Sequence, residues 1–195
     1  ALDVSPNAEI NSIKALDELG EGNQADVVAG IEWAIEQDID VLNLSLTNPR
    51  ASLALKQMTE KATEAGIILV AASGNNETEQ EQASNDIMYP AQYDTVIGVG
   101  SVDRRLNRSP FSYVGSSLEY VAPGEDIFST YRNTVEGTNY YARLSGTSMA
   151  APFVTGIIAL YKEVYPDLST NELKNIMAES AEDLGDPGRD AHYGY

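Results

Sequence analysis

The stretch LSGTSMAAP, residues 144–152, decides how the rest of this sequence is interpreted. The run 149–164 is almost entirely apolar, which predicts a buried helix with Pro152 in its first turn, where a missing N–H costs little. Ser148 then lies at the N-terminus of that helix, where unpaired N–H groups and the helix dipole favour negative charge. Two interpretations follow. Either Ser148 or Thr147 caps the helix, which is the commoner role, or Ser148 is a nucleophile whose own N–H stabilises an oxyanion.

Around this stretch, short β-rich runs alternate with helical runs. Amphipathic patterns predict helices at 25–37 and 53–65, and the capping-box spacing of Ser169 and Glu172 opens a last helix. Strands are expected at 10–16, 41–46, 67–72, 96–102 and 120–122. The continuous apolar run 67–72 is typical of a parallel strand covered on both faces. The alternation predicts an α/β fold, a mostly parallel sheet flanked by helices on both faces.

Length and composition indicate one soluble domain, 1–195, with 43% apolar and 22% charged residues. The formal net charge of -18 repels phosphate backbones, so no nucleic-acid partner is expected. No apolar run reaches the roughly 18 residues of a membrane span, and no secretion signal is visible at the start. The sequence has no cysteine, which excludes disulfides and thiolate catalysis. The acidic patch 77–82 is expected to be a solvated loop.

Several motifs resemble those of the subtilisin-like (subtilase) serine proteases. GTSMAAP at 146–152 resembles the nucleophile segment of that family. GIEWAI at 30–35 and DVLNLSL at 40–46 resemble its helix and the substrate-binding strand that follows, and VAASGN at 70–75 resembles its oxyanion segment. YPA at 89–91, VIGVGSV at 96–102 and VAPG at 121–124 match in the same order. The resemblance covers nearly the whole chain and implies a serine endopeptidase that forms an acyl-enzyme.

The resemblance also implies the catalytic roles. Ser148 corresponds to the nucleophile, and the Asn75 amide to the donor that completes the oxyanion hole. The alternative for Asn75 is a turn residue after Gly74, a common role for asparagine. Ser45, Leu46 and Thr47 would pair with an extended peptide or protein substrate by adding it as a strand.

The resemblance further places Ala72, Ser73 and Gly74 around the pocket for the side chain before the cleaved bond, with Met88 at the base of that pocket. Val27, Leu46 and Leu55 would line an apolar pocket further along, or Val27 and Leu55 are simply core residues.

Three residues depart from the family pattern. Thr47 stands where glycine is usual and would narrow the cleft. Met88, with a long thioether, predicts a shallower, apolar pocket. Phe153 replaces a histidine that is not catalytic in the family, so it bears on packing.

The largest departure concerns the catalytic triad. In this family the triad runs Asp, His, Ser along the chain, and the first two precede the segment matched by residues 1–6. The domain is therefore expected to be incomplete at both ends and to need an N-terminal segment, in cis or as a second chain. His192 lies in a region that is structural in the family and is expected to be a surface histidine. The isolated chain is predicted to be inactive; the alternative function is a non-catalytic binding or regulatory module.

No cofactor is expected for catalysis. By resemblance, the carbonyls of Ala91, Tyr93 and Val96, with Glu119 nearby, form a weak site for calcium or an alkali cation, which prefer oxygen ligands. A secreted or cell-surface bacterial location is expected, with the cytoplasm as the alternative.

Overall fold

The computed structural model describes residues 1–76, 87–133 and 137–195, so the acidic patch 77–82 lies outside the described residues. Helices and strands alternate at first, and a hairpin and two further helices follow. The elements are α1 (Gln24–Glu36), β1 (Val41–Leu44), α2 (Leu53–Glu64), β2 (Ile68–Ala72), β3 (Val96–Val102), β4 (Leu118–Pro123), β5 (Ile127–Asn133), β6 (Thr138–Leu144), α3 (Thr147–Val164) and α4 (Thr170–Ser180).

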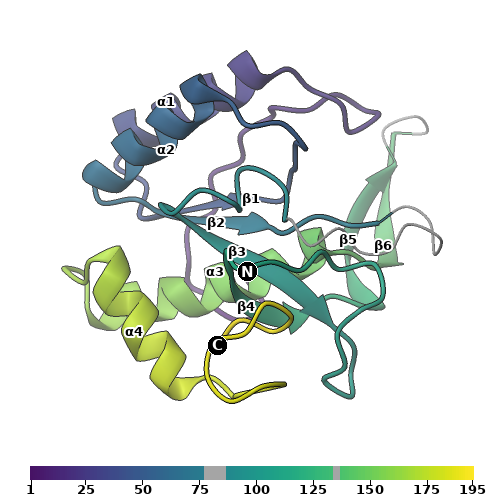
Figure 1. Cartoon of the computed structure of the whole chain (residues 1–195). Helices are drawn as coiled ribbons and strands as arrows, with labels where there is room; N and C mark the ends of the chain where they lie inside the picture. Colours follow the sequence, from purple (N-terminus) through teal and green to yellow (C-terminus); the bar gives the residue numbers. More distant parts are fainter. Residues whose placement is uncertain (77–86, 134–136) are drawn as a thin grey trace.

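A four-stranded parallel sheet, in the order β1-β2-β3-β4, forms the centre of the molecule. Helices α1 and α2 cover one face of it, and α3 and α4 cover the other (Figure 1). Each face has its own apolar core, with Ile31 and Leu69 in the first and Val70 and Ile158 in the second. Successive residues of β2 serve different cores because side chains alternate along a strand. The predicted α/β fold is confirmed.

The best-predicted elements are the central strands and the last helix. Every residue of β2 and β3 is buried, as a continuous apolar run requires when helices cover both faces. Gly66, just after α2, has φ of +91°, which glycine adopts without steric cost, and the chain turns directly into β2. Ser169 and Glu172 form the predicted capping box of α4.

The strand predicted at 10–16 is absent from the structure. A strand exists only where a neighbour supplies hydrogen bonds, and within the described residues no backbone hydrogen bond joins 10–16 to another segment. Strand β1 ends at Leu44, two residues earlier than predicted, and the residues after it approach the start of α3 instead.

Helix α3 begins at Thr147, two residues before the predicted start, so Pro152 lies in the second turn and not in the first. The helix packs across all four strands of the sheet. The prediction that it is buried all round is wrong for its outer face, where Ile157 and Leu160 are partly exposed and Val164 is 65% exposed. In the described ranges, neither α3 nor any other helix is long and apolar enough to cross a membrane.

Strands β5 and β6 form an antiparallel hairpin, here named the ribbon, that the sequence patterns did not predict. It stands at one side of the molecule, beside the start of α3 (Figure 1). Among the described elements, neither of its strands makes extensive contact with anything but the other. Its aromatic residues, including Phe128 and Tyr141, are exposed, so the buried-exposed alternation that marks a strand in sequence is missing.

Candidate active site

Ser148 is the second residue of α3. The N-cap position is Gly146, with φ of 156°, and no side chain caps the helix. The interpretation of Ser148 or Thr147 as the helix cap is therefore wrong. The Ser148 N–H is one of the first four N–H groups of a helix, which find no partner inside it, and the dipole favours negative charge there. This position suits the stabilisation of an oxyanion.

Two hydrogen bonds, here named the serine clasp, hold Ser45 against Ser148. Ser45 Oγ donates to the carbonyl oxygen of Ser148 at 2.9 Å, and Ser148 Oγ donates to the carbonyl oxygen of Ser45 at 3.4 Å. The Ser148 carbonyl is available because the residue four positions later is Pro152, which has no N–H to complete the helical bond. The proline thus frees an acceptor that the end of the β1 segment uses.

The serine clasp continues into a chain of polar side chains. Asn43 Nδ2 donates to Ser45 Oγ at 2.9 Å, and Thr155 Oγ1 donates to Asn43 Oδ1 at 3.0 Å. Sequence analysis missed both Asn43 and Thr155. The signal was present, because Asn43 shares a strand face with Ser45 and Thr155 follows Ser148 by two helical turns, on the same helix face.

Thr147 fixes the orientation of Asn75. Asn75 Oδ1 accepts from the Thr147 N–H at 2.8 Å and from the Thr147 hydroxyl at 3.0 Å. The same hydroxyl accepts from the Gly74 N–H at 3.2 Å. Because Oδ1 receives both bonds, the Nδ2 group is left to donate elsewhere, as an oxyanion donor must. Thr147 is a positioning residue that the sequence motif did not reveal.

Gly74 lies between the oxyanion residues and the predicted specificity pocket. Ala72, Ser73 and Gly74 are buried, and Gly74 has φ of +113°. A Cβ at Gly74 would lie 2.5 Å from the ring of Tyr113 and 3.1 Å from the side chain of Met88, so only glycine fits. The Met88 N–H donates to the Ser73 carbonyl at 2.8 Å. Met88 therefore fills space beside Gly74.

A cleft of about 510 Å³ opens beside Ser148. Residues 20–24 form one wall, and Ser45, Leu46, Thr47, Asn48 and Tyr89 contribute to the other. Val27 and Leu55 line the cleft and also belong to the core beneath α1 and α2. They are core residues with one side turned to the cleft.

The residues of the predicted cation site lie on and beside β3 and β4. Ala91 and Val96 are buried, and the Tyr93 carbonyl accepts from the Val96 N–H at 2.9 Å. Lys174, from α4, places its ammonium 2.7 Å from Glu119 Oε1, with both side chains largely buried. Burial raises the pKa of the Glu119 carboxyl, although the Lys174 ammonium opposes the shift. Glu119 Oε2 is buried and has no hydrogen-bond partner in the described part of the chain.

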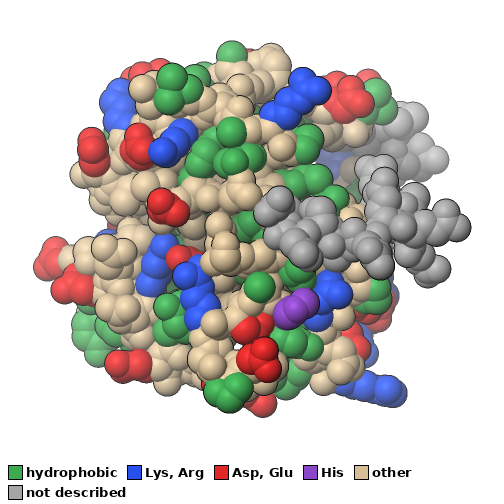
Figure 2. All heavy atoms as spheres, viewed as in Figure 1, with side chains coloured by type: hydrophobic (Ala, Val, Ile, Leu, Met, Phe, Trp, Pro, Cys, Tyr) green, Lys and Arg blue, Asp and Glu red, His purple; other side chains and the backbone are tan. Residues whose placement is uncertain are grey.

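His192 is exposed in the turn that Asp190 and Gly194 close near the C-terminal end (Figure 2, purple). Within the ranges described, its side chain forms no hydrogen bond, and Ser148 Oγ has no side-chain partner. The structure therefore brings together Ser148, Asn75 and the cleft residues, and does not bring a base to Ser148.

Replacing the Thr147 hydroxyl tests its positioning role. In Thr147→Val, the Gly74 N–H loses its only acceptor among the described contacts and Asn75 Oδ1 loses one donor, so the free energy of unfolding should fall by about 2 kcal/mol. Thr147→Ser retains the hydroxyl and serves as the control, with a loss of less than about 1 kcal/mol. Urea denaturation measures both; a valine variant as stable as its parent would contradict the role.

Removing the Lys174 ammonium tests the buried ion pair. The pKa of the Glu119 carboxyl is higher in the folded than in the unfolded chain, so the protonated carboxyl favours folding. This stabilisation is fully present below the unfolded-state pKa, and it is lost as the pH rises through the folded-state pKa. Lys174→Met raises that pKa further, so the variant should match its parent near pH ~4 and lose about 3 kcal/mol near pH ~8. Unfolding at the two pH values measures this. Lys174→Arg should show no such difference, and an equal loss at both pH values would refute the explanation.

The sequence and the fold of this chain are similar to those of known proteins. The Subtilase family model matches residues 1–195. The chain is 46% identical to Subtilisin DY from Bacillus licheniformis over 185 residues, which cover 95% of this chain and 65% of that protein. It is 37% identical to Minor extracellular protease Epr from Bacillus subtilis, covering 98% of this chain and 28% of that protein.

A solved lanthipeptide protease superposes with a TM-score of 0.83 at 27% identity, covering 100% of this chain and 69% of that structure. Of the two curated relatives named above, in contrast, the chain spans less than two thirds of the length. Since the family model covers every residue and the strands, nucleophile turn and oxyanion segment lie where the motifs require, this chain belongs to the subtilase family.

Proposed function

We propose that this chain is the nucleophile-bearing part of a serine endopeptidase. Two hydrogen-bond donors near one reactive position carry the proposal. One is the Ser148 N–H at the start of α3, which has no partner among the described residues, and the other is the Nδ2 group of Asn75, which Thr147 orients. In the proposed reaction, Ser148 Oγ attacks a peptide carbonyl and these two donors stabilise the resulting oxyanion. A base takes the proton of Ser148 Oγ and passes it to the leaving nitrogen, so that the C–N bond breaks, the amine departs and an acyl-enzyme remains. Water then hydrolyses the acyl-enzyme, which releases the carboxylic acid and restores Ser148.

The proton of Ser148 Oγ needs a base that the described site does not supply, because its partner is the Ser45 carbonyl. We therefore propose that a segment carrying the triad Asp and His completes the site, in cis or as a second chain. A cavity of about 380 Å³ supports this: it lies between residues 9–13 and β1, near Asn43 and Thr155. An added strand parallel to β1 would end beside Ser45, and therefore beside Ser148.

The proposed substrate is an extended polypeptide lying along Ser45, Leu46 and Thr47, in the cleft that borders Ser148. A structural calcium or alkali cation at Ala91, Tyr93, Val96 and Glu119 is also proposed. The support for it is Glu119 Oε2, which is buried and has no hydrogen-bond partner among the described residues. An extracellular bacterial location is proposed from the relatives, one of which is named as an extracellular protease of Bacillus subtilis.

Covalent labelling of Ser148 tests the proposed function. A fluorophosphonate should react slowly with the isolated chain and at least about 100-fold faster once the completing segment is present, because general-base catalysis contributes at least that factor. Mass spectrometry locates the label, and Ser148→Ala is the control. Rapid labelling of the isolated chain would refute the need for an external base. No labelling in the completed protein would favour the non-catalytic binding module.

Cleavage profiling tests the proposed shallow pocket. Met88 lies beside Gly74, so small apolar residues before the cleaved bond should be preferred over aromatic ones. Met88→Gly should open the pocket and raise the relative kcat/KM for aromatic residues by about 10-fold. Met58→Leu, a change on α2, is the control and should leave the profile unchanged. A parent enzyme that already favours bulky aromatic residues would disprove the prediction.

A further inference from the structure

The ribbon presents two chemically different faces. Directly paired residues of an antiparallel hairpin share a face, and successive residues alternate. The register therefore collects one set of side chains, here named the basic aromatic face: Phe128, Thr130, Arg132, Asn139, Tyr141 and Arg143. The opposite face carries Tyr131 and Tyr140, whose ring centroids are 5.2 Å apart.

Side chains of the basic aromatic face are arranged in advance of any partner. Phe128 and Tyr141 stack with centroids 5.2 Å apart and an interplanar angle of 17°. The Arg143 guanidinium lies 5.3 Å from the Phe128 ring centroid. Phe128 and Tyr141 are 55% and 64% exposed. Exposed aromatic residues that stack on each other, with no described element packed extensively over them, indicate an interaction surface.

Electrostatics favours an acidic partner for this face. The chain carries a formal net charge of -18, yet residues 127–144 contain two arginines and one acidic residue. Arg143 is shared with Asp126 at the base of the ribbon, at 3.0 Å, so Arg132 is the main source of positive charge further along. An acidic peptide is repelled by most of the surface and less so at this face, where the Arg132 guanidinium is available to bind a carboxylate and the rings can pack on apolar side chains.

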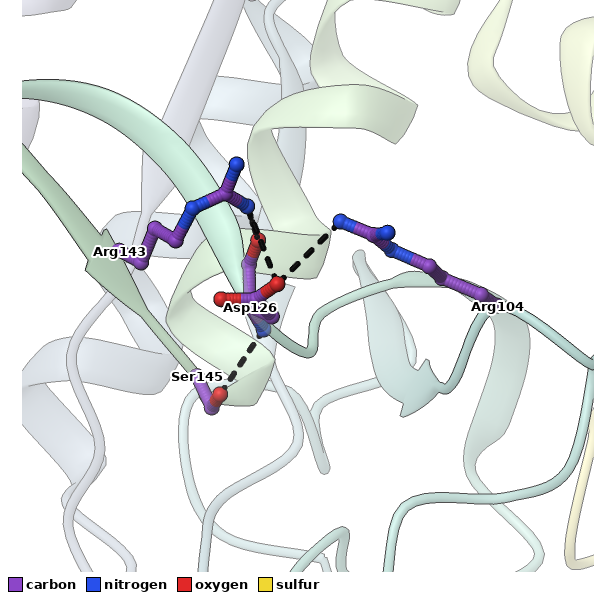
Figure 3. Close-up of polar contacts among 4 residues, drawn as sticks. All are labelled: Arg104, Asp126, Arg143 and Ser145. Atoms are coloured by element: carbon purple, nitrogen blue, oxygen red, sulfur yellow. Dashed lines mark hydrogen bonds and ion pairs between the residues drawn. The ribbon is translucent and has the colours of Figure 1, made fainter.

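The base of the ribbon is tied to the nucleophile turn. The Asp126 N–H donates to Ser145 Oγ at 3.0 Å, Arg143 contacts Asp126, and Arg104 pairs with the same carboxylate at 3.2 Å (Figure 3). The Gly146 N–H donates to the Gly124 carbonyl at 2.8 Å. The ribbon therefore begins and ends next to the turn that carries Ser148.

We propose that the basic aromatic face binds the leaving-group side of the polypeptide substrate, and that it selects acidic segments containing aromatic residues. The cleft lined by Ser45, Leu46 and Thr47 takes the acyl side, and no ribbon residue lines that cleft. By elimination, the ribbon would contact the part of the substrate that follows the cleaved bond. This inference rests on the proposed function, because it needs Ser148 to be the point of cleavage.

Binding of two fluorescein-labelled nonapeptides to the chain tests the proposal without requiring catalysis. The forward peptide is Leu-Ala-Leu-Ala-Glu-Phe-Asp-Phe-Glu, and the reversed peptide carries the acidic aromatic half first. Fluorescence anisotropy at low ionic strength should show the forward peptide binding about 10-fold more tightly, with the preference weakened by salt. Equal affinities for the two peptides would overturn the assignment to the leaving-group side.

Substitutions locate the binding to the ribbon. Phe128→Ser and Arg132→Glu should each weaken the forward peptide about 10-fold and abolish the preference. Tyr165→Ser, an exposed aromatic at the end of α3, and Lys56→Glu, an exposed charge on α2, are the matched controls and should leave affinity within about 2-fold. Circular dichroism checks that each variant is folded.

The two proposals fail in different ways. If the ribbon variants bind the forward peptide like their parent, the ribbon proposal is wrong, whatever Ser148 does. If Ser148 resists fluorophosphonate in the completed protein while the forward preference and its loss in the variants persist, the ribbon binds acidic aromatic peptides but the protease function is wrong. In that case the assignment of the ribbon to the leaving-group side of a substrate is also wrong.

Discussion

The serine clasp between Ser45 and Ser148 is the contact on which the site depends. It joins the end of the edge strand of the sheet to the first turn of the helix that crosses all four strands. A proline in the second turn of α3 would ordinarily only weaken the helix. Here Pro152 leaves the Ser148 carbonyl without a helical donor, and the Ser45 hydroxyl takes it. The carbonyl that the proline frees in the helix therefore becomes the attachment point of the segment that follows β1.

A second set of contacts sets the chemistry around the same turn. The Thr147 hydroxyl links the Gly74 N–H to Asn75 Oδ1, so one side chain at the start of α3 positions the whole oxyanion segment. Gly74 can take part only as glycine, because of its backbone angle and the nearness of Tyr113. Hydrogen bonds of backbone groups, hydroxyl groups and the Asn75 amide thus link the turn at Ser148, the segment of Gly74 and Asn75, and the end of β1.

Much of this could be predicted from sequence, for identifiable physical reasons. The strands at 67–72 and 96–102 are apolar throughout because helices cover both faces, and such runs are unambiguous in an alternating chain. The segment 10–16 has the composition of a strand but no described neighbour to pair with, and pairing is not a property of the segment itself. The ribbon was missed since its aromatic residues face solvent.

Within the candidate site, Ser148 and Asn75 could be proposed from sequence because each lies in a long specific motif. The role of Thr147 could not, since it depends on a contact with a segment far away in the sequence. Asn43 and Thr155 had a weak signal in their spacing from Ser45 and Ser148, but their contact with each other also joins distant segments. The consequence of Pro152 became visible only once the true start of α3 was fixed, because a two-residue shift changes which carbonyl the proline leaves free.

The distances along the chain have a further consequence, for the order of folding. Ser45 and Ser148 are separated by 103 residues, and Asn75 and Thr147 by 72. Contacts of such long range close large loops, which slows folding and delays the contacts relative to local helices. The sheet and its flanking helices can begin to form first, and the oxyanion site is assembled only when the C-terminal third of the chain docks. A chain that ends before α3 holds Ser45, Leu46 and Thr47 but lacks Ser148, so the candidate site is complete only after α3 has been synthesised.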